Sequence, residues 1–213
     1  MDSYFSHQRP EMLRFVPAGA RRVLDVGCGN GGFGAALRKN RPGIEVWGVE
    51  PDVDAAANAA KVLDRAIQGM FTSDLDLPGS GFDAVIFNDS LEHFPDHVPA
   101  LRLAASLIKP GGSLVASIPN VRHWPHMKHY IFQADWAYSE SGILDRTHLR
   151  FFTRKSILRT LNEQGFNVDH IEGITPCWRD IRLPLANALL PKSWRDIIHL
   201  QFALTAKLKR DGA

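Results

Sequence analysis

The sequence predicts an α/β fold organised around a doubly wound, mostly parallel seven-stranded sheet whose last strand is antiparallel. Apolar runs of strand length alternate with segments of helical periodicity from residue 22 to residue 118, which is typical of parallel strands joined by crossover helices. The run at 81–88 is nearly continuously apolar, as expected for a central strand covered on both faces. At 200–208 apolar and polar residues alternate, which predicts a half-buried strand, and its closeness in sequence to the strand at 166–171 favours an antiparallel arrangement.

The other elements are indicated by apolar periodicity and by local stop signals. Further strands are expected at 22–26, 44–49, 63–68 and 113–118, and helices at 8–16, 32–40, 52–61, 96–109, between Thr153 and Gly165, and within 176–198. The helix at 96–109 should close at Pro110-Gly111-Gly112, because proline and glycine end helices. Residues 119–152 show no clean period and are expected to form an irregular insertion.

Composition places the chain among ordinary globular proteins. Its 213 residues suit one domain, and contents of 45% hydrophobic and 23% charged residues are average values. The formal net charge of +2 provides no strong field for nucleic acid. Cys28 and Cys177 are far apart in the sequence, which fits a reducing compartment without a disulfide framework. Neither a signal peptide nor a run of about 18 apolar residues is visible, so we expect a cytoplasmic protein with no integral membrane segment.

A glycine-rich turn follows the first strand. Gly27, Gly29 and Gly32 fit the pattern G-x-G-x-x-G, in which glycine permits a sharp turn and the close approach of a ligand to the backbone. The helix that begins there directs unpaired N–H groups at the turn. Glu50 ends the second strand 18 residues beyond Gly32, where nucleotide-binding folds place an acid on the adenosine ribose. Ordinary strand-to-helix turns also match the glycine pattern, so the interpretation depends on this context.

Four segments in this order and spacing resemble the class I S-adenosylmethionine-dependent methyltransferases. They are Leu24–Gly31, Trp47–Pro51, Phe82–Asn88 with the following Leu91-Glu92-His93, and Leu107–Gly112, and they cover about residues 20–120. The resemblance implies a Rossmann-like methyltransferase fold with S-adenosyl-L-methionine as the cofactor. Two later segments, 118–123 and 142–153, are similar to a subgroup associated with cell-surface polysaccharide and glycosyl-transfer pathways.

The resemblance also implies how a single methyltransferase domain at 1–213 is organised. Residues 1–19 would form a lid helix, 20–118 the donor-binding core, 119–152 an acceptor-side insertion, and 153–213 the C-terminal helix and strands. The expected partner is a small-molecule or glycan acceptor, without nucleic acid or an integral membrane contact, and a homodimer is compatible with this organisation.

The donor-binding residues implied by the resemblance lie at strand ends, in loops and in the lid. They are Arg9, Asp25, Gly27, Gly29, Glu50, Pro51, Asp74, Leu75 and Asn88. Glu50 would accept the ribose hydroxyls, Asp25 would lie near the amino-acid part of the donor, and Arg9 would meet its carboxylate. Asp74 would face the adenine amino group, with Leu75 beside the ring. Each charged residue has a plainer alternative: Asp25 as a brace for the loop, and Asp74 and Arg9 as solvated groups.

Methyl transfer to a hydroxyl requires removal of a proton, and histidine titrates in a suitable range. His148 is the candidate base, because it lies in one of the later similar segments and is flanked by Asp145 and Arg146. His93 is a second catalytic candidate next to the fourth-strand motif. Either histidine could instead be a structural residue that satisfies a buried loop.

Three further histidines raise the question of a metal. Their spacing puts His123 and His126 on one helical face and His129 to the side, and no cluster of acids accompanies them. No metal site is therefore expected.

The leading functional hypothesis is O-methylation of a sugar-containing or other small-molecule acceptor. A quinone-type aromatic acceptor is the nearest rival. An NAD-dependent oxidoreductase also matches the glycine pattern and the acid at Glu50, but Asp25 and the Pro-Gly-Gly turn fit it less well. A donor-binding protein without catalysis is the remaining alternative, because a fold does not fix a function.

Overall fold

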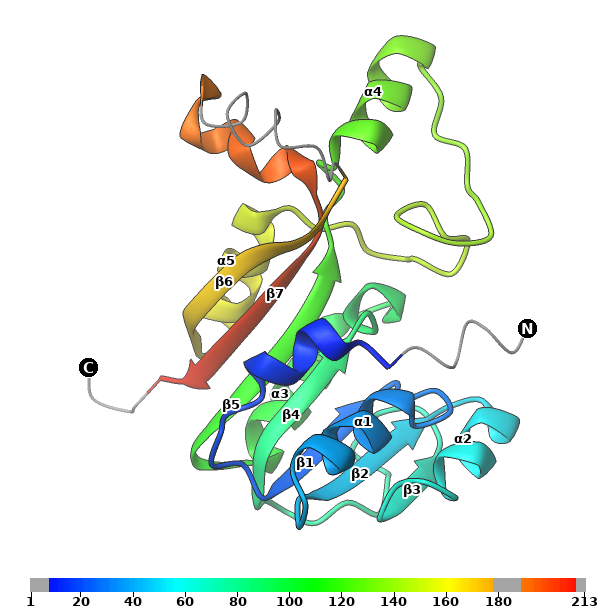
Figure 1. The fold of residues 1–213 in the computed structure, drawn as a ribbon, viewed down its shortest axis with the longest axis vertical. Helices are drawn as coiled ribbons and strands as arrows, with labels where there is room; N and C mark the ends of the chain where they lie inside the picture. The colour runs from blue at the N-terminus through cyan, green and yellow to red at the C-terminus, as the bar shows by residue number, and fades with distance from the viewer. Residues whose placement is uncertain (1–7, 178–188, 210–213) are drawn as a thin grey trace.

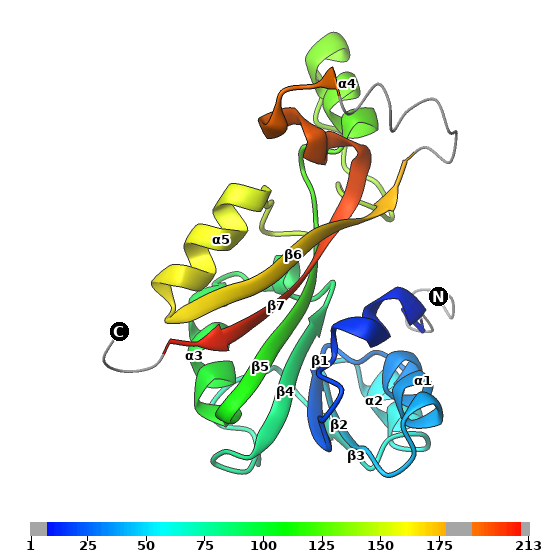
Figure 2. The same ribbon diagram turned by 60° about the vertical axis from the view of Figure 1, so that its left-hand side comes forward.

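The computed structural model describes residues 8–177 and 189–209 and contains one sheet of seven strands. The strand order is β3-β2-β1-β4-β5-β7-β6, with helices on both faces (Figures 1 and 2). The strands are β1 Arg22–Val26, β2 Glu45–Glu50, β3 Arg65–Gln68, β4 Phe82–Asn88, β5 Ile108–Pro119, β6 Phe166–Pro176 and β7 His199–Leu208. The α-helices are α1 Gly32–Asn40, α2 Val53–Ala59, α3 His97–Leu107, α4 Trp124–Gln133 and α5 Arg154–Glu163, and the 3-10 helices are η2 Pro10–Phe15, η3 Leu91–His93 and η4 Lys192–Ile198.

The predicted sheet is confirmed, including its reversed strand. The pairs β1 with β2, β1 with β4, β2 with β3 and β4 with β5 are all parallel. β7 is antiparallel to both of its neighbours, β5 and β6, and lies between them. Because the strand order reverses direction between β1 and β4, their carboxyl ends open a crevice, which is where ligands bind in such sheets.

Each face of the sheet has its own apolar layer, because successive strand residues point to opposite sides. On one side Val23 of β1 belongs to a buried cluster with residues of η2, α1 and α2. On the other side the next residue, Leu24, belongs to a cluster with residues of α3 and α5. Figure 2 shows these two sets of helices on opposite sides of the sheet. The near-continuous apolar sequence of β4 follows from this double coverage, since six of its seven residues are buried.

Several expected elements differ in extent in the structure. The short helix predicted at 8–16 is present as the 3-10 helix η2. The helix predicted at 96–109 ends at Leu107, and Pro110-Gly111-Gly112 lies inside β5, where the register against β4 shifts between Phe82 and Ala84. β6 continues to Pro176, five residues past the predicted end at 171. The helices expected within 176–198 are represented by η4, and residues 178–188 lie outside the described part of the chain.

The insertion at 119–152 contains a helix that the sequence did not reveal. α4 spans Trp124–Gln133 and has no buried residue. It stands clear of the sheet beyond the end of β5 (Figure 1). A helix that does not pack on the core has no need of a regular apolar stripe, which explains the missing period.

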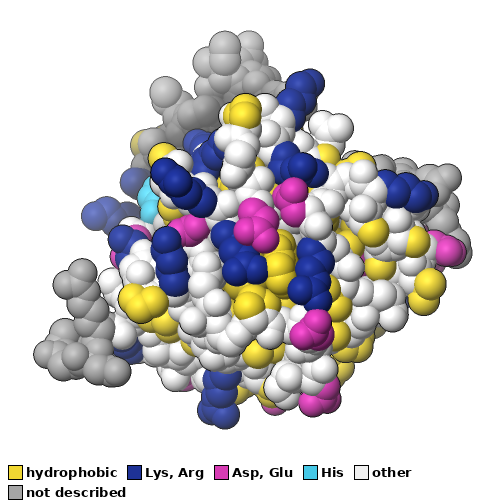
Figure 3. All heavy atoms as spheres, turned by 90° about the horizontal axis from the view of Figure 1, so that it is seen from below, with side chains coloured by type: hydrophobic (Ala, Val, Ile, Leu, Met, Phe, Trp, Pro, Cys, Tyr) yellow, Lys and Arg dark blue, Asp and Glu magenta, His cyan; other side chains and the backbone are white. Residues whose placement is uncertain are grey.

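The face at the amino ends of the parallel strands has mixed charge. Figure 3 shows Lys and Arg side chains interspersed with Asp and Glu on this side of the molecule. One such group is buried: Asp83 accepts hydrogen bonds from the backbone N–H groups of Arg21 and Arg22, each at 2.8 Å, and pairs with Lys109. This face therefore offers no continuous basic surface for nucleic acid. In the described part of the chain, no helix combines the length and the apolar character that a bilayer crossing requires.

Replacing Gly48 with alanine is expected to destabilise the fold by about 1–3 kcal/mol, because the added methyl group overpacks the core. A Cβ atom there would lie 2.5 Å from Cys28 Sγ and 2.7 Å from Leu63 Cδ1. Gly19→Ala is the matched control, since a Cβ at Gly19 meets nothing within 4 Å. Urea unfolding of both variants measures the difference, and equal midpoints would contradict the expected crowding at β2.

Candidate functional site

The main cavity lies at the carboxyl ends of β1, β2 and β4, at the point where the strand order reverses. Its volume is about 540 Å³. The glycine turn and the end of β2 line one region of the cavity, and η3 with the loop at 141–148 lines another. Most of the residues predicted from the sequence therefore come together in one space.

The glycine-rich turn needs glycine for its backbone conformation. Gly27, Gly29 and Gly31 all have positive φ angles, of 76°, 54° and 79°. A Cβ atom at Gly27 would also lie 2.9 Å from the Cβ atom of Ser90, so the turn fits tightly against the segment after β4. These conformations leave the backbone of Gly27 and Gly29 on the wall of the cavity without side chains in front of it.

Glu50 closes the glycine turn from the end of β2. Its side chain is buried, and Oε2 accepts a hydrogen bond of 2.8 Å from the Gly29 N–H. Oε1 accepts one of 3.0 Å from the N–H of Asp52, which itself caps α2. Two backbone donors thus fix the carboxylate at the cavity wall, and its remaining lone pairs are available to a ligand. Pro51 follows it and also lines the cavity.

Asp25 is a buried acid at the floor of the cavity. It is 1% exposed, and Oδ1 has no hydrogen-bond partner. Burial, followed by the nearby charge of Glu50, raises its pKa from the ordinary 3.8 to about 7. A carboxyl group in this state can accept a positively charged donor group or carry a proton itself.

The raised pKa of Asp25 predicts a pH dependence of folding stability. Between pH 4 and pH 7 the folded protein keeps a proton that the unfolded chain has released, so the free energy of unfolding falls as the pH rises through this window. The fall is roughly 4 kcal/mol for this group. Asp25→Asn should remove that part of the dependence, whereas Asp74→Asn, at an exposed position, should keep it. Urea unfolding across the window measures both variants, and an unchanged slope in Asp25→Asn would contradict the prediction.

The segment after β4 contributes further unpaired polar groups. Asn88 lines the cavity, and neither its side-chain oxygen nor its nitrogen has a hydrogen-bond partner. The buried hydroxyl of Ser90 is also without a partner. Buried polar groups are normally satisfied, so a cavity lined by several that are not is suited to a polar ligand.

Arg9 reaches the cavity from the N-terminal segment but is already engaged. It pairs with Asp89 and donates hydrogen bonds to Ser117 Oγ at 2.9 Å and Gln201 Oε1 at 3.1 Å. These partners lie after β4, in β5 and in β7. The guanidinium therefore joins the N-terminal segment to β5, to β7 and to the loop that follows β4.

Asp74 and Leu75 are not brought to the cavity. Asp74 is exposed, and Leu75 packs against the apolar layer that contains β4. The cavity wall after β3 is made by the three residues Gly69, Met70 and Phe71. β3 ends at Gln68, so the chain passes the cavity immediately and has left it before the acid at position 74.

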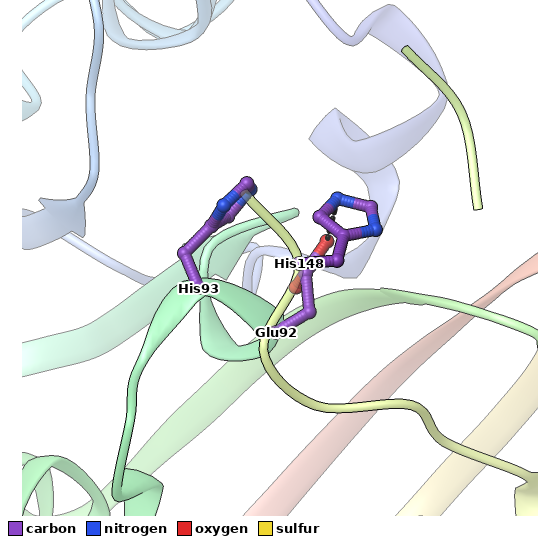
Figure 4. A group of neighbouring side chains, drawn as sticks. All are labelled: Glu92, His93 and His148. Carbon is purple, nitrogen blue, oxygen red and sulfur yellow. Dashed lines mark ion pairs between the residues drawn. The ribbon is translucent and has the colours of Figure 1, made fainter. Parts of the chain in front are cut away.

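Three side chains form a compact cluster beside the loop at 141–148. Glu92 and His93 come from η3, and His148 comes from a loop that follows 55 residues later (Figure 4). His148 Nε2 lies 3.9 Å from Glu92 Oε1, and the two imidazole rings pack edge to face with centroids 4.7 Å apart. Glu92 is 1% exposed, and neither of its carboxylate oxygens has a hydrogen-bond partner.

Backbone groups hold the cluster in place. His148 Nδ1 lies 2.9 Å from the carbonyl oxygen of Ile143, and His93 Nδ1 lies 3.1 Å from that of Thr147. Burial is the main cause that raises the pKa of Glu92 well above its ordinary value, and the charge of Asp89 adds to it. Burial also lowers the pKa of His93, as does the neighbouring His148.

The predicted histidines are thus neighbours, and sequence reasoning missed the acid between them. In the motif Leu91-Glu92-His93, Glu92 is next to a catalytic candidate in sequence. Only the folded path of the loop at 141–148 shows that His148 lies 3.9 Å from its carboxylate. The histidine set considered for a metal behaves differently: His123 is buried with its pKa lowered to about 4, chiefly by burial, and His126 packs against Trp136.

Comparison with known proteins identifies the class. A family model described as a methyltransferase domain matches residues 4–171, and the chain belongs to this family. The ubiquinone biosynthesis O-methyltransferase of Xanthomonas campestris pv. campestris is 36% identical over 104 residues, which cover 46% of this chain and 43% of that protein. An uncharacterized methyltransferase of Mycobacterium tuberculosis is 37% identical over 102 residues, which cover 46% of this chain and 51% of its own length. The matches thus span about half the length of these relatives.

Solved structures agree on the fold. A SAM-dependent methyltransferase from Archaeoglobus fulgidus superposes with a TM-score of 0.69 at 24% identity, covering 97% of this chain and 93% of that one. The [4+2]-cyclase SpnF superposes with a TM-score of 0.63 at 21% identity, covering 93% and 79%. The Rossmann-like methyltransferase fold is therefore established, and the cyclase shows that this fold also serves another reaction.

Proposed function

We propose that the protein transfers the methyl group of S-adenosyl-L-methionine to an oxygen atom of a small acceptor. The observation that carries this proposal is the shared cavity, which has the Glu50 carboxylate at one side and the Glu92–His93–His148 cluster at another. Family membership supports S-adenosyl-L-methionine as the methyl donor. The two histidines and the acid of the cluster support an acceptor hydroxyl that must lose its proton.

The donor would lie across the glycine turn. Glu50 would accept hydrogen bonds from the ribose hydroxyls, and Pro51 would lie beside the adenosine. Gly27 and Gly29 would let the methionine part approach the backbone, while the polar group of Asn88 would gain a partner in the donor ammonium. Asp25 has an unpaired buried oxygen that this ammonium would also satisfy, directly or through water.

The N-terminal segment would act as a lid over this donor. Arg9 lines the cavity, and the donor carboxylate would share its guanidinium with Asp89. On this view the chain is one catalytic domain, with 20–118 binding the donor and 119–152 facing the acceptor. The adenine would contact Met70 and Phe71, which occupy the position expected for Asp74 and Leu75.

The chemistry is an in-line displacement. The acceptor oxygen attacks the methyl carbon, the bond between carbon and the sulfonium sulfur breaks, and S-adenosylhomocysteine leaves with the electron pair. The hydroxyl proton must leave as well, and the cluster containing His148 and His93 lies in the same cavity to promote its loss. Alignment of the three reacting atoms supplies most of the acceleration, on the order of 7–11 kcal/mol when it is ideal.

Two acceptor classes are favoured by different observations. The similarity of 118–123 and 142–153 to a subgroup from polysaccharide pathways favours a sugar-containing acceptor, and residues 141–143 line the cavity. The Xanthomonas relative is named for ubiquinone biosynthesis, which favours an aromatic hydroxyl acceptor. Both acceptors present a hydroxyl group to the same cluster.

Calorimetric titration should show micromolar binding of S-adenosylmethionine and S-adenosylhomocysteine, with no heat from NAD, because the turn and Glu50 are proposed to accommodate the adenosyl-sulfur ligands. An acceptor screen that detects S-adenosylhomocysteine formation with nucleotide sugars, glycans and quinone-type phenols then tests the reaction. Binding of NAD, with no heat from S-adenosylmethionine or S-adenosylhomocysteine, would overturn the donor assignment. Donor binding without transfer to either class would favour a binding protein or another reaction.

A further inference from the structure

The Glu92 carboxylate is the least satisfied acidic group near the cavity. It is 1% exposed, and both oxygens lack hydrogen-bond partners. A buried carboxylate in this condition is costly unless a cation or a proton neutralises it. Within the described residues, the imidazole of His148 pairs with it, but Nε2 lies 3.9 Å from Oε1, too far for a hydrogen bond.

The space between these groups is somewhat wider than a bound metal site. Glu92, His93 and His148 each offer one ligand atom, and these three atoms all lie within 4.8 Å of one another. Bonds of about 2.0–2.2 Å from a single ion in tetrahedral geometry put such atoms about 3.4 Å apart, so binding would draw the side chains together by up to about 1.4 Å. Figure 4 shows the carboxylate of Glu92 directed at the ring of His148, with the His93 ring nearby.

The backbone contacts of the imidazoles match the outer contacts of metal-binding histidines. Nδ1 of His148 and Nδ1 of His93 each face a backbone carbonyl, of Ile143 and Thr147 respectively. A proton on Nδ1 in this arrangement leaves the lone pair on Nε2, which is the nitrogen that then ligates a metal.

The two segments that supply the ligands are also tied together. The backbone N–H groups of Leu149 and Arg150 donate to the carbonyl oxygen of Glu92 at 2.8 and 3.0 Å. Asp145 steadies the loop by accepting hydrogen bonds from the Thr147 N–H at 2.8 Å and its hydroxyl at 2.6 Å. The fold therefore holds the two ligand-bearing segments next to each other before any ion arrives.

We propose that Glu92, His93 and His148 bind one divalent first-row transition-metal ion, of which Zn²⁺ is the reference, at the acceptor side of the cavity. Two imidazoles and one carboxylate suit Zn²⁺, Co²⁺ or Mn²⁺ and provide too few oxygen ligands for Ca²⁺. Three protein ligands leave a coordination position open to the cavity, as in catalytic metal sites.

The role of the ion in the reaction rests on the proposed function. An acceptor hydroxyl that coordinates the ion loses its proton to solvent more readily, and its oxygen then attacks the methyl group. With the ion present His148 acts as a ligand, whereas without it His148 acts as the base. The two descriptions share the same residues and differ in whether transfer needs a metal.

The test starts from the full chain stripped with a chelator and dialysed. Calorimetric titration with Zn²⁺ should show one site per chain, and Co²⁺ should give the visible absorption of a nitrogen-ligated ion. Glu92→Gln and His148→Ala should each weaken Zn²⁺ binding by at least about 10-fold. His126→Ala is the matched control, because it removes a histidine that packs against Trp136 outside the cluster. Equal Zn²⁺ affinity in the wild type and both cluster variants would overturn the proposal.

Two further measurements keep the outcomes distinct. Glu92→Asp, which keeps the carboxylate, should retain more Zn²⁺ affinity than Glu92→Gln, so that a folding defect cannot imitate ligand loss. S-adenosylhomocysteine is titrated into the same samples. Donor binding and full transfer activity in the stripped protein, with no Zn²⁺ binding, would overturn the metal site and leave the proposed function in place. Zn²⁺ binding at the cluster without donor binding would support the metal site and count against the proposed function.

Discussion

Glu50→Ala is expected to weaken S-adenosylmethionine binding by at least about 100-fold. Two ribose hydroxyls donating to a carboxylate contribute about 1.5–3 kcal/mol each, and each 1.4 kcal/mol is a factor of ten in affinity. The carboxylate also fixes Gly29 through its N–H, so the variant loosens the turn as well as removing the acceptor. Calorimetric titration with S-adenosylmethionine measures the loss.

Glu45→Ala is the matched control for this prediction. Glu45 begins the same strand, pairs with Arg22 and accepts from Trp47 Nε1, but it does not line the cavity. Its affinity for the donor should remain that of the wild type. Titrations are made at a temperature where thermal unfolding shows both variants folded. Undiminished donor affinity in Glu50→Ala would place the donor away from the end of β2.

His148→Ala should lower turnover by roughly 100-fold while donor affinity is retained. The side chain lines the cavity beside Glu92 and His93, and its removal would take away the proposed base or metal ligand. The rate of S-adenosylhomocysteine formation with a working acceptor measures the effect, and donor titration shows whether binding is intact.

His126→Ala again serves as the control, and it should leave turnover unchanged. Added imidazole should restore part of the activity of His148→Ala if the missing ring acts in proton loss. Wild-type turnover in His148→Ala would remove this histidine from the mechanism, and the proton would then have to leave by another route.

Much of the fold could be predicted because its signals are local. α1 spans Gly32–Asn40 as predicted, since a glycine turn starts it and Pro42 prevents its continuation. β7 was correctly predicted as a strand but wrongly as half-buried: its residues 201–204 are all buried, so its centre is covered on both faces. α4 was missed, because periodicity reports packing on a core and this helix buries no side chain. The placement of Pro110-Gly111-Gly112 in β5 depended on pairing with β4, which no local pattern encodes.

The candidate site shows the same contrast between residues that local patterns predict and contacts that depend on the tertiary fold. The glycine turn, Asp25 and Glu50 belong to strand ends whose relative positions follow from sheet order, so a short motif was enough to bring them to one cavity. The contact between Glu92 and His148 depends on the path of an irregular loop. Asp74 was placed by the family resemblance, whereas the residues that pass the cavity are those directly after β3, which ends at Gln68. Local patterns therefore predicted the side of the cavity that contains the glycine turn and Glu50. On the side of the Glu92–His93–His148 cluster they identified candidate residues but not their contacts.

The position of β7 also has a consequence for synthesis on the ribosome. β5 pairs through Ser113–Pro119 with residues 201–207, which are translated long after it. A nascent chain that has emerged as far as α5 therefore leaves one edge of β5 without its final neighbour, and such an edge can pair wrongly with other chains. Leu200 and Gln201 also complete the cavity lining. The complete cavity therefore forms only after β7 has been translated, and chaperones that shield open strands should act in the interval between β5 and β7.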